Sequence, residues 1–228
     1  MTQTERSGGP SSHVGGWLRR LGCALLLVCG APWAEAADAA DAADVIAKVE
    51  AKYGPVTALK ASFTQITRSE ALGDQQQSGR LAVERPSKMR WDFAGDGRQF
   101  ITDGSTMWIY NPADKQVLRY SDFSTAAATA DALLQSLDKL SELFDVELRG
   151  TEPGPVLGLR PKGEQSQVKE LQLSLTAELL VSKVQIVDGF GGITELAFEN
   201  VELPDDIPDE QFTFTVPEGV EVVDAGSL

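Results

Sequence analysis

Adjacent carboxylates are the first residues in this chain whose type and spacing suggest chemistry. Asp205-Asp206 and Asp209-Glu210 form two such pairs near the C-terminus. Two carboxyl groups that flank a glycosidic bond supply the acid and the base of a glycoside hydrolase. However, the chain contains 34 Asp and Glu residues against 20 Lys and Arg, so neighbouring carboxylates are expected by chance. A solvated acidic loop is the favoured interpretation, and a hydrolase that uses acidic residues stays open as an alternative function.

Two other stretches suggest ligand binding. The glycine-rich stretch 189–192 lacks the Lys and the Ser or Thr that follow in a Walker loop, and it favours a hairpin turn. Trp91, Trp108, Tyr110 and Tyr120 suit either a stacking platform for sugars or bases or an ordinary core. Core is the favoured interpretation of each one taken alone.

The N-terminus has the pattern of a secretory signal peptide. Arg19 and Arg20 precede a short apolar run over residues 21–30, and the small-residue site Ala34-Glu35-Ala36 follows. The run is too short for a membrane-spanning helix, which needs about 20 apolar residues. We therefore expect residues 1–36 to be a signal peptide cleaved after Ala36, and residues 37–228 to form one exported domain.

This cleavage would remove every histidine and cysteine. His13, Cys23 and Cys29 all lie within the signal. The remaining chain would have no disulfide, no thiol nucleophile, no Ser-His-Asp triad and no Cys or His ligand for zinc. The alternative is a lipoprotein signal that lipidates a cysteine. Cys29 follows Val28 instead of a small residue, and Cys23 stands at the start of the apolar run, so we expect ordinary cleavage.

Charge argues against two classes of partner. Without residues 1–36 the chain loses three arginines and two glutamates, and its net charge becomes −15. Such a surface repels phosphate backbones and anionic lipid headgroups. We expect no nucleic-acid partner, no tight binding to a membrane surface, and a monomer.

Hydrophobic periodicity predicts a helix followed by a meander of strands. Residues 37–44 are a low-complexity spacer that grades into a helix, on which Val45, Val49 and Tyr53 share one face until Pro55 ends it. Period-two alternation then predicts strands in 59–69, 80–85 and 88–93 and in the runs between 99 and 122. The segment "DQQQSG", residues 74–79, is expected to be a turn or loop.

The second half repeats this organisation. Leu133, Leu137, Leu140 and Phe144 form the apolar stripe of the longest helical pattern, within residues 124–148. Strands return in "VLGLRP", "VKELQLSLT", "LLVSKVQIVD", "ITELAFENVEL" and "QFTFTVPEGVEVVD". The pattern predicts one long antiparallel sheet with a few helices over one face. Because two good helices cover little of a long apolar face, part of it is expected to line a cavity.

Four ordered blocks of sequence resemble a known family. In chain order, "ASFTQ" (61–65), "ERPSKMRWDF" (84–93), "FITDGSTMWIYNP" (100–112) and "QFTFTVPEGVEVVD" (211–224) resemble the LolA family of periplasmic outer-membrane lipoprotein carriers. The resemblance implies a mainly β (α+β) fold, an unclosed β-barrel made of one curved antiparallel sheet, with helices as a lid over an apolar cavity.

The resemblance also implies a function in the periplasm. The carrier accepts triacylated lipoproteins from an inner-membrane ABC transporter complex and hands them to an outer-membrane lipoprotein acceptor. It needs neither nucleotide nor metal, and we expect no cofactor and no catalytic residue. A periplasmic sensor of lipids or lipoproteins shares this architecture but carries a second domain that contacts a membrane-bound regulator. The last block ends near Leu228, which favours the carrier.

The candidate site follows from the alternation and the resemblance together. In the block that begins at Glu84, Met89, Trp91 and Phe93 are expected to face the cavity, and Arg90 and Asp92 to face water. Met89 stands where the family often has an aromatic residue. The full set of expected lipid-binding residues is Phe63, Leu81, Val83, Met89, Trp91, Phe93, Leu133, Leu137 and Leu140.

Arg85 is the candidate for lid closure and transfer. It matches the arginine of the family's Arg-Pro motif, which the resemblance links to hydrogen bonds with lid carbonyls. Its alternation with Leu81 and Val83 places it on the apolar face, where a lone arginine needs partners. An arginine at a sheet edge that extends into solvent is the alternative.

Overall fold

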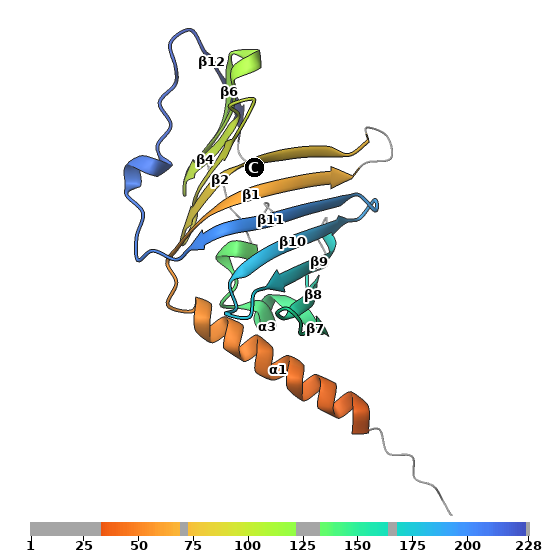
Figure 1. Cartoon of the computed structure of the whole chain (residues 1–228). Helices are drawn as coiled ribbons and strands as arrows, with labels where there is room; N and C mark the ends of the chain where they lie inside the picture. The colour runs from red at the N-terminus through yellow and green to blue at the C-terminus, as the bar shows by residue number, and fades with distance from the viewer. Residues whose placement is uncertain (1–32, 69–72, 122–132, 164–167, 227–228) are drawn as a thin grey trace, which may run out of the picture. The chain divides into compact units, whose positions relative to one another are not determined.

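The chain folds around one large sheet. A computed structural model describes residues 33–68, 73–121, 133–163 and 168–226, with the backbone alone for residues 33–40. Within these ranges, 12 strands pair in the order β12-β6-β5-β4-β3-β2-β1-β11-β10-β9-β8-β7 (Figure 1). This order is linear, with β12 and β7 at its two edges, so the sheet is unclosed. The predicted fold class, mainly β with one curved open sheet, is confirmed.

The strands follow one another along most of the sheet. They are β1 (Ala58–Arg68), β2 (Gln75–Glu84), β3 (Lys88–Phe93), β4 (Gln99–Asp103), β5 (Thr106–Asn111), β6 (Gln116–Ser121), β7 (Phe144–Gly150), β8 (Val156–Pro161), β9 (Val168–Leu175), β10 (Val181–Asp188), β11 (Ile193–Glu202) and β12 (Glu221–Gly226).

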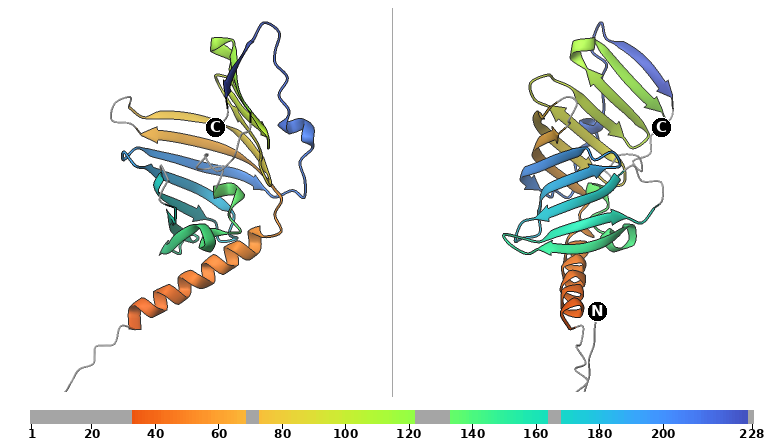
Figure 2. Two further views of the ribbon diagram at one scale, coloured as in Figure 1. Left: turned by 180° about the vertical axis from the view of Figure 1, so that it is seen from behind. Right: turned by 90° about the vertical axis from the view of Figure 1, so that its right-hand side faces the viewer.

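The neighbouring strands described are antiparallel, with β12 as the exception. β12 pairs parallel to β6, so the expectation of a wholly antiparallel sheet is wrong at this edge. The register shifts within several strands, for example between Lys60 and Ser62 of β1. Such bulges bend a strand and increase its twist, and they accompany the curvature seen in Figure 2.

The predicted alternation is confirmed on the central strands. Leu59, Ala61 and Phe63 of β1 are buried, and the residues between them are half-buried. The same holds for Met89, Trp91 and Phe93 of β3. Below, the inner face is the face of the sheet that carries Phe63, and the outer face is its opposite.

The first helix packs against the inner face. α1 runs over Trp33–Tyr53 and therefore includes the predicted spacer 37–44. Val49 and Tyr53 are buried at 0% and 1% exposure and Val45 packs beside them, so the predicted helical face is confirmed. The helix ends just before Pro55, as expected. In Figure 1, α1 lies at the end of the sheet that carries β7 to β10. No helix among the residues described combines the length and apolar character needed to cross a bilayer.

The second predicted helix is broken in the part that the structure describes. Residues 133–135 are helical, residues 136–138 form turns, and α3 spans only Leu140–Leu143. Phe144 begins β7 instead of continuing the apolar stripe. Strand pairing with β8 overrides the local helical pattern here, because Phe144 pairs with Pro161 and Val146 with Leu159. The start of the predicted helix, and the signal peptide up to residue 32, lie outside the described residues.

Two further expectations are wrong for tertiary reasons. Residues 75–79 of the expected turn "DQQQSG" belong to β2, because Gln75 to Gly79 pair with β1. The run "QFTFT" is not a strand: η3 (Asp209–Phe212) precedes irregular chain that leads to β12. Phe212 is instead buried on the outer face with Ile207, Ala58 and Ala82.

Short turns join neighbouring strands, and the hairpin turn expected at residues 189–192 is confirmed. Residues 104–105 connect β4 to β5, and η1 (Pro112–Asp114) connects β5 to β6. The glycine-rich stretch 189–192 is the hairpin turn between β10 and β11. There the Asp188 Oδ1 accepts hydrogen bonds from the backbone N–H groups of Phe190 and Gly192, each at 2.8 Å.

Candidate functional site

The apolar side chains predicted to bind lipid all lie in one buried cluster on the inner face. The sheet contributes Phe63, Leu81, Val83, Met89, Trp91 and Phe93, and the helical segment contributes Leu133, Leu137 and Leu140. Each of these side chains is at most 7% exposed. The sequence therefore identified residues that come together, although they are spread over nearly 80 positions of the chain.

Aromatic rings form the centre of the sheet side of this cluster. The ring centroids of Phe63 and Trp91 are 4.6 Å apart at an interplanar angle of 70°, and those of Phe63 and Phe93 are 5.2 Å apart at 81°. These edge-to-face contacts are a favourable geometry for aromatic pairs.

Gly79 makes room for this arrangement. A Cβ atom added to Gly79 would lie 2.9 Å from the ring of Phe63 and would also overlap the backbone oxygen of Asp92. The glycine in "DQQQSG" is thus required by close packing within a strand rather than by a turn.

A lid covers the cluster from the other side. We use "lid" for the helical segment 133–143 together with the last turn of α1. Leu133, Leu137 and Leu140 are each fully buried. A hydrogen bond joins the two parts of the lid. The Glu50 Oε1 of α1 accepts it, at 2.7 Å, from the backbone N–H of Ser141.

Tyr53 connects the lid to the sheet. Its hydroxyl oxygen accepts a buried hydrogen bond of 3.0 Å from the backbone N–H of Val181 on β10. Burial raises the pKa of the Tyr53 phenol above its ordinary value, and the hydrogen bond from Val181 only partly offsets this. Tyr53 is therefore a neutral side chain that fixes the end of α1 to the sheet.

Arg85 links the sheet to both parts of the lid. Its Nη1 donates a hydrogen bond of 3.1 Å to the backbone oxygen of Tyr53. Its Nη2 lies 3.0 Å from the Oδ1 of Asp138, and the two side chains are only 20% and 22% exposed. Among the residues described, this carboxylate oxygen has no well-directed hydrogen bond, so the contact is an ion pair. The expected bond to a lid carbonyl is present, and the alternative of an arginine extended into solvent is not what the structure shows.

The carboxylate pairs considered for hydrolysis lie elsewhere. Asp205, Asp206, Asp209 and Glu210 are all exposed, in the segment that crosses the outer face. Asp209 forms an ion pair of 2.5 Å with Lys88. In the part of the chain that the structure describes, no group of three or more His, Cys, Asp or Glu residues is arranged to hold a metal.

Sequence reasoning missed an extension of the inner face over β4, β5 and β6. Cross-strand pairing places Phe100 beside Trp91, Ile109 beside Phe100 and Leu118 beside Ile109. Met107 and Tyr120 form the next pair. All five side chains are only half-buried, so the apolar surface continues beyond the covered cluster. The alternation there does not reveal the inner face, because the outer positions Ile101 and Val117 are equally apolar.

Similarity to known proteins agrees with this architecture. Residues 55–215 match the family described as "Outer membrane lipoprotein carrier protein LolA". The "Outer-membrane lipoprotein carrier protein" of Alkalilimnicola ehrlichii is 33% identical over 177 residues, which are 76% of this chain and 81% of that protein. The protein of the same name from Hahella chejuensis is 35% identical over 175 residues, 74% of this chain and 82% of its own length.

A solved structure supports the fold alone. An uncharacterized conserved protein from Thermus thermophilus has a TM-score of 0.50 and 17% identity, and the match covers 81% of this chain and 99% of that one. The family match, the identity to two curated relatives and the open sheet with its lid lead to one assignment: this chain belongs to the LolA family of outer-membrane lipoprotein carrier proteins.

Proposed function

We propose that this chain carries lipoproteins from the inner to the outer membrane, with their acyl chains bound against the inner face of the sheet. The observation that supports this most strongly is the single apolar cluster shared by the sheet and a separate lid. The relatives from Alkalilimnicola ehrlichii and Hahella chejuensis are named as carriers of this kind. The carrier acts in the periplasm, after residues 1–36 have been removed as a signal peptide.

Transfer free energies explain why a carrier is needed. Each acyl methylene exposed to water costs about 0.8 kcal/mol, so three acyl chains resist entry into water by tens of kcal/mol. The lid leucines occupy the inner face when the carrier is empty. Acyl chains therefore replace Leu133, Leu137 and Leu140 as partners of Phe63 and Trp91, and the net cost of loading stays small because one apolar contact replaces another.

The half-buried extension over β4 to β6 gives the acyl chains a path to the cluster. Met107, Ile109, Leu118 and Tyr120 provide apolar surface next to Phe100, which already packs against the cluster. In this proposal an acyl chain first contacts the extension and then displaces the lid. Methionine suits such a surface because its side chain adapts to ligands of different shape.

The contacts of Arg85 set the balance between loading and release. Arg85 contacts Tyr53 and Asp138 of the lid, and in this proposal those contacts break when the lid opens. They stabilise the empty state, and so they favour delivery to an acceptor. An inner-membrane ABC transporter complex supplies the cargo and the energy, and an outer-membrane acceptor receives the cargo. The role is that of a carrier and not of an enzyme.

Loading tests the proposal directly. The chain is expressed with its N-terminus intact, purified from the periplasm and incubated with membranes that contain a triacylated lipoprotein and its transporter. Native mass spectrometry is expected to show a one-to-one complex with the lipoprotein and, for the protein itself, the mass of residues 37–228. Absence of any complex would refute the carrier function.

Paired tryptophan variants locate the site. Trp91→Gln changes the inner face, whereas Trp108→Gln changes a half-buried residue of β5 on the outer face. We expect Trp91→Gln to reduce loading at least tenfold and Trp108→Gln to leave it within twofold. Equal loss in both variants would contradict the inner face as the site.

A further inference from the structure

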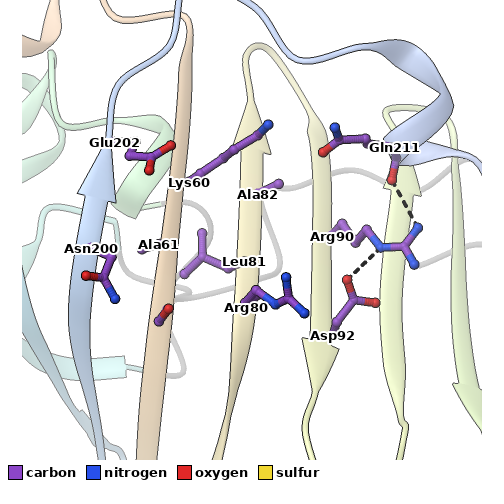
Figure 3. A pocket seen from close by; sticks show the side chains of 11 residues that line it. Lys60, Ala61, Arg80, Leu81, Ala82, Arg90, Asp92, Asn200, Glu202 and Gln211 are labelled. Atoms are coloured by element: carbon purple, nitrogen blue, oxygen red, sulfur yellow. Dashed lines mark hydrogen bonds and ion pairs between the residues drawn. The ribbon is translucent and has the colours of Figure 1, made fainter.

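The outer face contains a polar groove that the carrier function does not use. It has a volume of about 500 Å³ and crosses β11, β1, β2 and β3 (Figure 3). The small residues Ser62 and Ala82 are among those that line it. Longer side chains surround it, and Gln211 of η3 forms one wall. This volume lies within the usual range of ligand-binding pockets.

Sheet register explains how the groove forms. Lys60 of β1 lies opposite Ala82 of β2, and Ala82 lies opposite Arg90 of β3. The small alanine thus separates two long basic side chains by two strand spacings, about 10 Å. Arg80 belongs to the next row, between Ser62 and Asp92.

Arg80 differs from the other described arginines in its charge partners. Seven of the eight described arginines have a carboxylate oxygen within 4.0 Å: Arg68, Arg85, Arg90, Arg98, Arg119, Arg149 and Arg160. Within the same described ranges, Arg80 has none, and neither has Lys60. The groove thus combines an arginine and a lysine that both lack a carboxylate partner among the described residues.

The other charged groups of the groove are arranged around these two. Arg90 donates from Nε to the Oδ2 of Asp92 at 2.8 Å and from Nη1 to the backbone oxygen of Gln211 at 3.1 Å (Figure 3). Asp92 is therefore neutralised by Arg90. Glu202 is the remaining carboxylate, and it lies opposite Lys60 in register without an ion pair between them.

The balance of unpaired charge is two cations against one carboxylate. That balance suits a ligand with a single negative charge and disfavours a phosphate dianion or an anionic membrane surface, which Glu202 and the acidic surroundings repel. Ser62, Asn200 and Gln211 supply neutral hydrogen-bonding groups at the same groove. These groups match the N–H and C=O groups of a peptide.

We propose that this groove binds a glutamate or aspartate side chain of an extended segment of a partner protein, with Arg80 and Lys60 as the groups that receive the carboxylate. The planar guanidinium of Arg80 offers two parallel donors to a carboxylate, and Lys60 adds a second charge. The site lies on the opposite side of the sheet from Phe63 and Trp91. A partner therefore binds there while the inner face is covered or loaded.

Nuclear magnetic resonance titration of the ¹⁵N-labelled exported chain tests this site. The probe is a blocked tripeptide, acetyl-Gly-Glu-Gly-amide, and its matched control is acetyl-Gly-Gln-Gly-amide. We expect saturable shifts of the amides of Ser62, Arg80 and Ala82 with the glutamate peptide, weakening as salt rises from 50 to 300 mM. Equal shifts with the glutamine peptide, or no saturable shift, would overturn the proposal. Tighter binding of inorganic phosphate than of the glutamate peptide would also overturn it.

Variants identify the receiving groups. Arg80→Gln is expected to weaken binding of the glutamate peptide at least tenfold, and Lys60→Gln several-fold, whereas Arg80→Lys retains part of the affinity. The control is Lys169→Gln, an exposed lysine of β9 outside the groove. Because Arg80 is exposed and makes no ion pair with the residues that the structure describes, its replacement is expected to leave both the fold and the uptake of lipoprotein unchanged. Unaltered peptide binding in Arg80→Gln would refute the assignment, whatever the outcome of the loading experiment.

Discussion

At the scale of single residues, Arg85 contacts both parts of the lid from the sheet. Its guanidinium contacts the Tyr53 carbonyl and the Asp138 carboxylate, which belong to the two parts of the lid. A hydrogen bond to a charged group contributes about 1.5–3 kcal/mol. Loss of these contacts therefore favours the open lid by about tenfold to a hundredfold.

We predict that Arg85→Leu retains lipoprotein on the carrier. The closed empty state loses its polar links, while the apolar inner face that holds the acyl chains is unchanged. The measurement is the fraction of lipoprotein released to the acceptor from preloaded carrier in a fixed time. The control is Arg160→Leu, since the ion pair of Arg160 with Glu147 is exposed to solvent. Normal release from Arg85→Leu would show that Arg85 does not set the balance.

Tyr53 gives a prediction about pH. Because its pKa is raised in the folded chain, the folded state keeps the phenol proton at pH values where the unfolded chain loses it. The stability that Tyr53 contributes is therefore complete below pH ~10 and is lost as the pH rises above that value.

The variant Tyr53→Phe isolates this contribution. It leaves the backbone N–H of Val181 without its buried acceptor, which costs about 1–3 kcal/mol in the free energy of unfolding near pH 8. We expect the difference between the two proteins, measured by urea denaturation, to shrink between pH 8 and pH 11. Tyr110→Phe, at a half-buried tyrosine that packs on Phe214, serves as the control. A difference that stays constant with pH would contradict the role assigned to burial of the phenol.

At the scale of elements, the segment 203–212 acts as a second cover on the outer face. Ile207 and Phe212 are 2% and 1% exposed. The Glu84 Oε2 accepts a hydrogen bond of 2.7 Å from the backbone N–H of Ile207, and the hydroxyl of Thr57 donates to the backbone oxygen of Asp205. This cover explains why Ala58 and Ala82 are buried although they alternate with inner-face residues.

We predict that Phe212→Ala destabilises the chain by about 3 kcal/mol, because truncating a buried phenylalanine leaves a cavity. The matched control is Phe190→Ala. Phe190 stands fully exposed at the tip of the β10–β11 hairpin, so its truncation is expected to change stability by less than about 0.5 kcal/mol. Both are measured by urea denaturation, and a small effect at Phe212 would mean that the outer cover contributes little to the fold.

At the scale of the whole molecule, the proposed function requires the sheet to stay intact while the lid moves. The sheet is held by continuous backbone pairing from β12 to β7. The lid is joined to it by apolar contacts and by a few polar links, among them those of Tyr53 and Arg85. Elements with few hydrogen bonds to the rest of a protein open more readily than central strands.

Hydrogen exchange measured by mass spectrometry checks this difference. We predict that residues 133–143 exchange at least tenfold faster in the lipoprotein-loaded carrier than in the empty one. The strands β1 and β11, at the centre of the sheet, are expected to keep their protection in both states and thus serve as an internal control. Protection of residues 133–143 that is unchanged by loading would exclude displacement of the lid.

The sequence by itself determined the inner face of the central strands. Alternation is a local property with a period of two residues, so it groups Met89 with Trp91 on β3 and Leu81 with Val83 on β2. The family resemblance implied that these groups share one face. It also determined the first helix and the hairpin turn at residues 189–192, whose residue types act over a few positions. The family resemblance rested on the same segments.

Only the tertiary structure decided what covers each face. The partners of Arg85, the strand assignment of residues 75–79 and the parallel pairing of β12 all depend on contacts between residues distant in the chain, where pairing and packing override local preference. The outer groove depends on sheet register: Lys60 and Arg90 are separated by 30 positions, and only pairing through Ala82 places them in one row. A local sequence pattern shows which side chains of one strand share a face. A site also depends on how the strands pair and on which elements cover the sheet, and no local pattern contains that information.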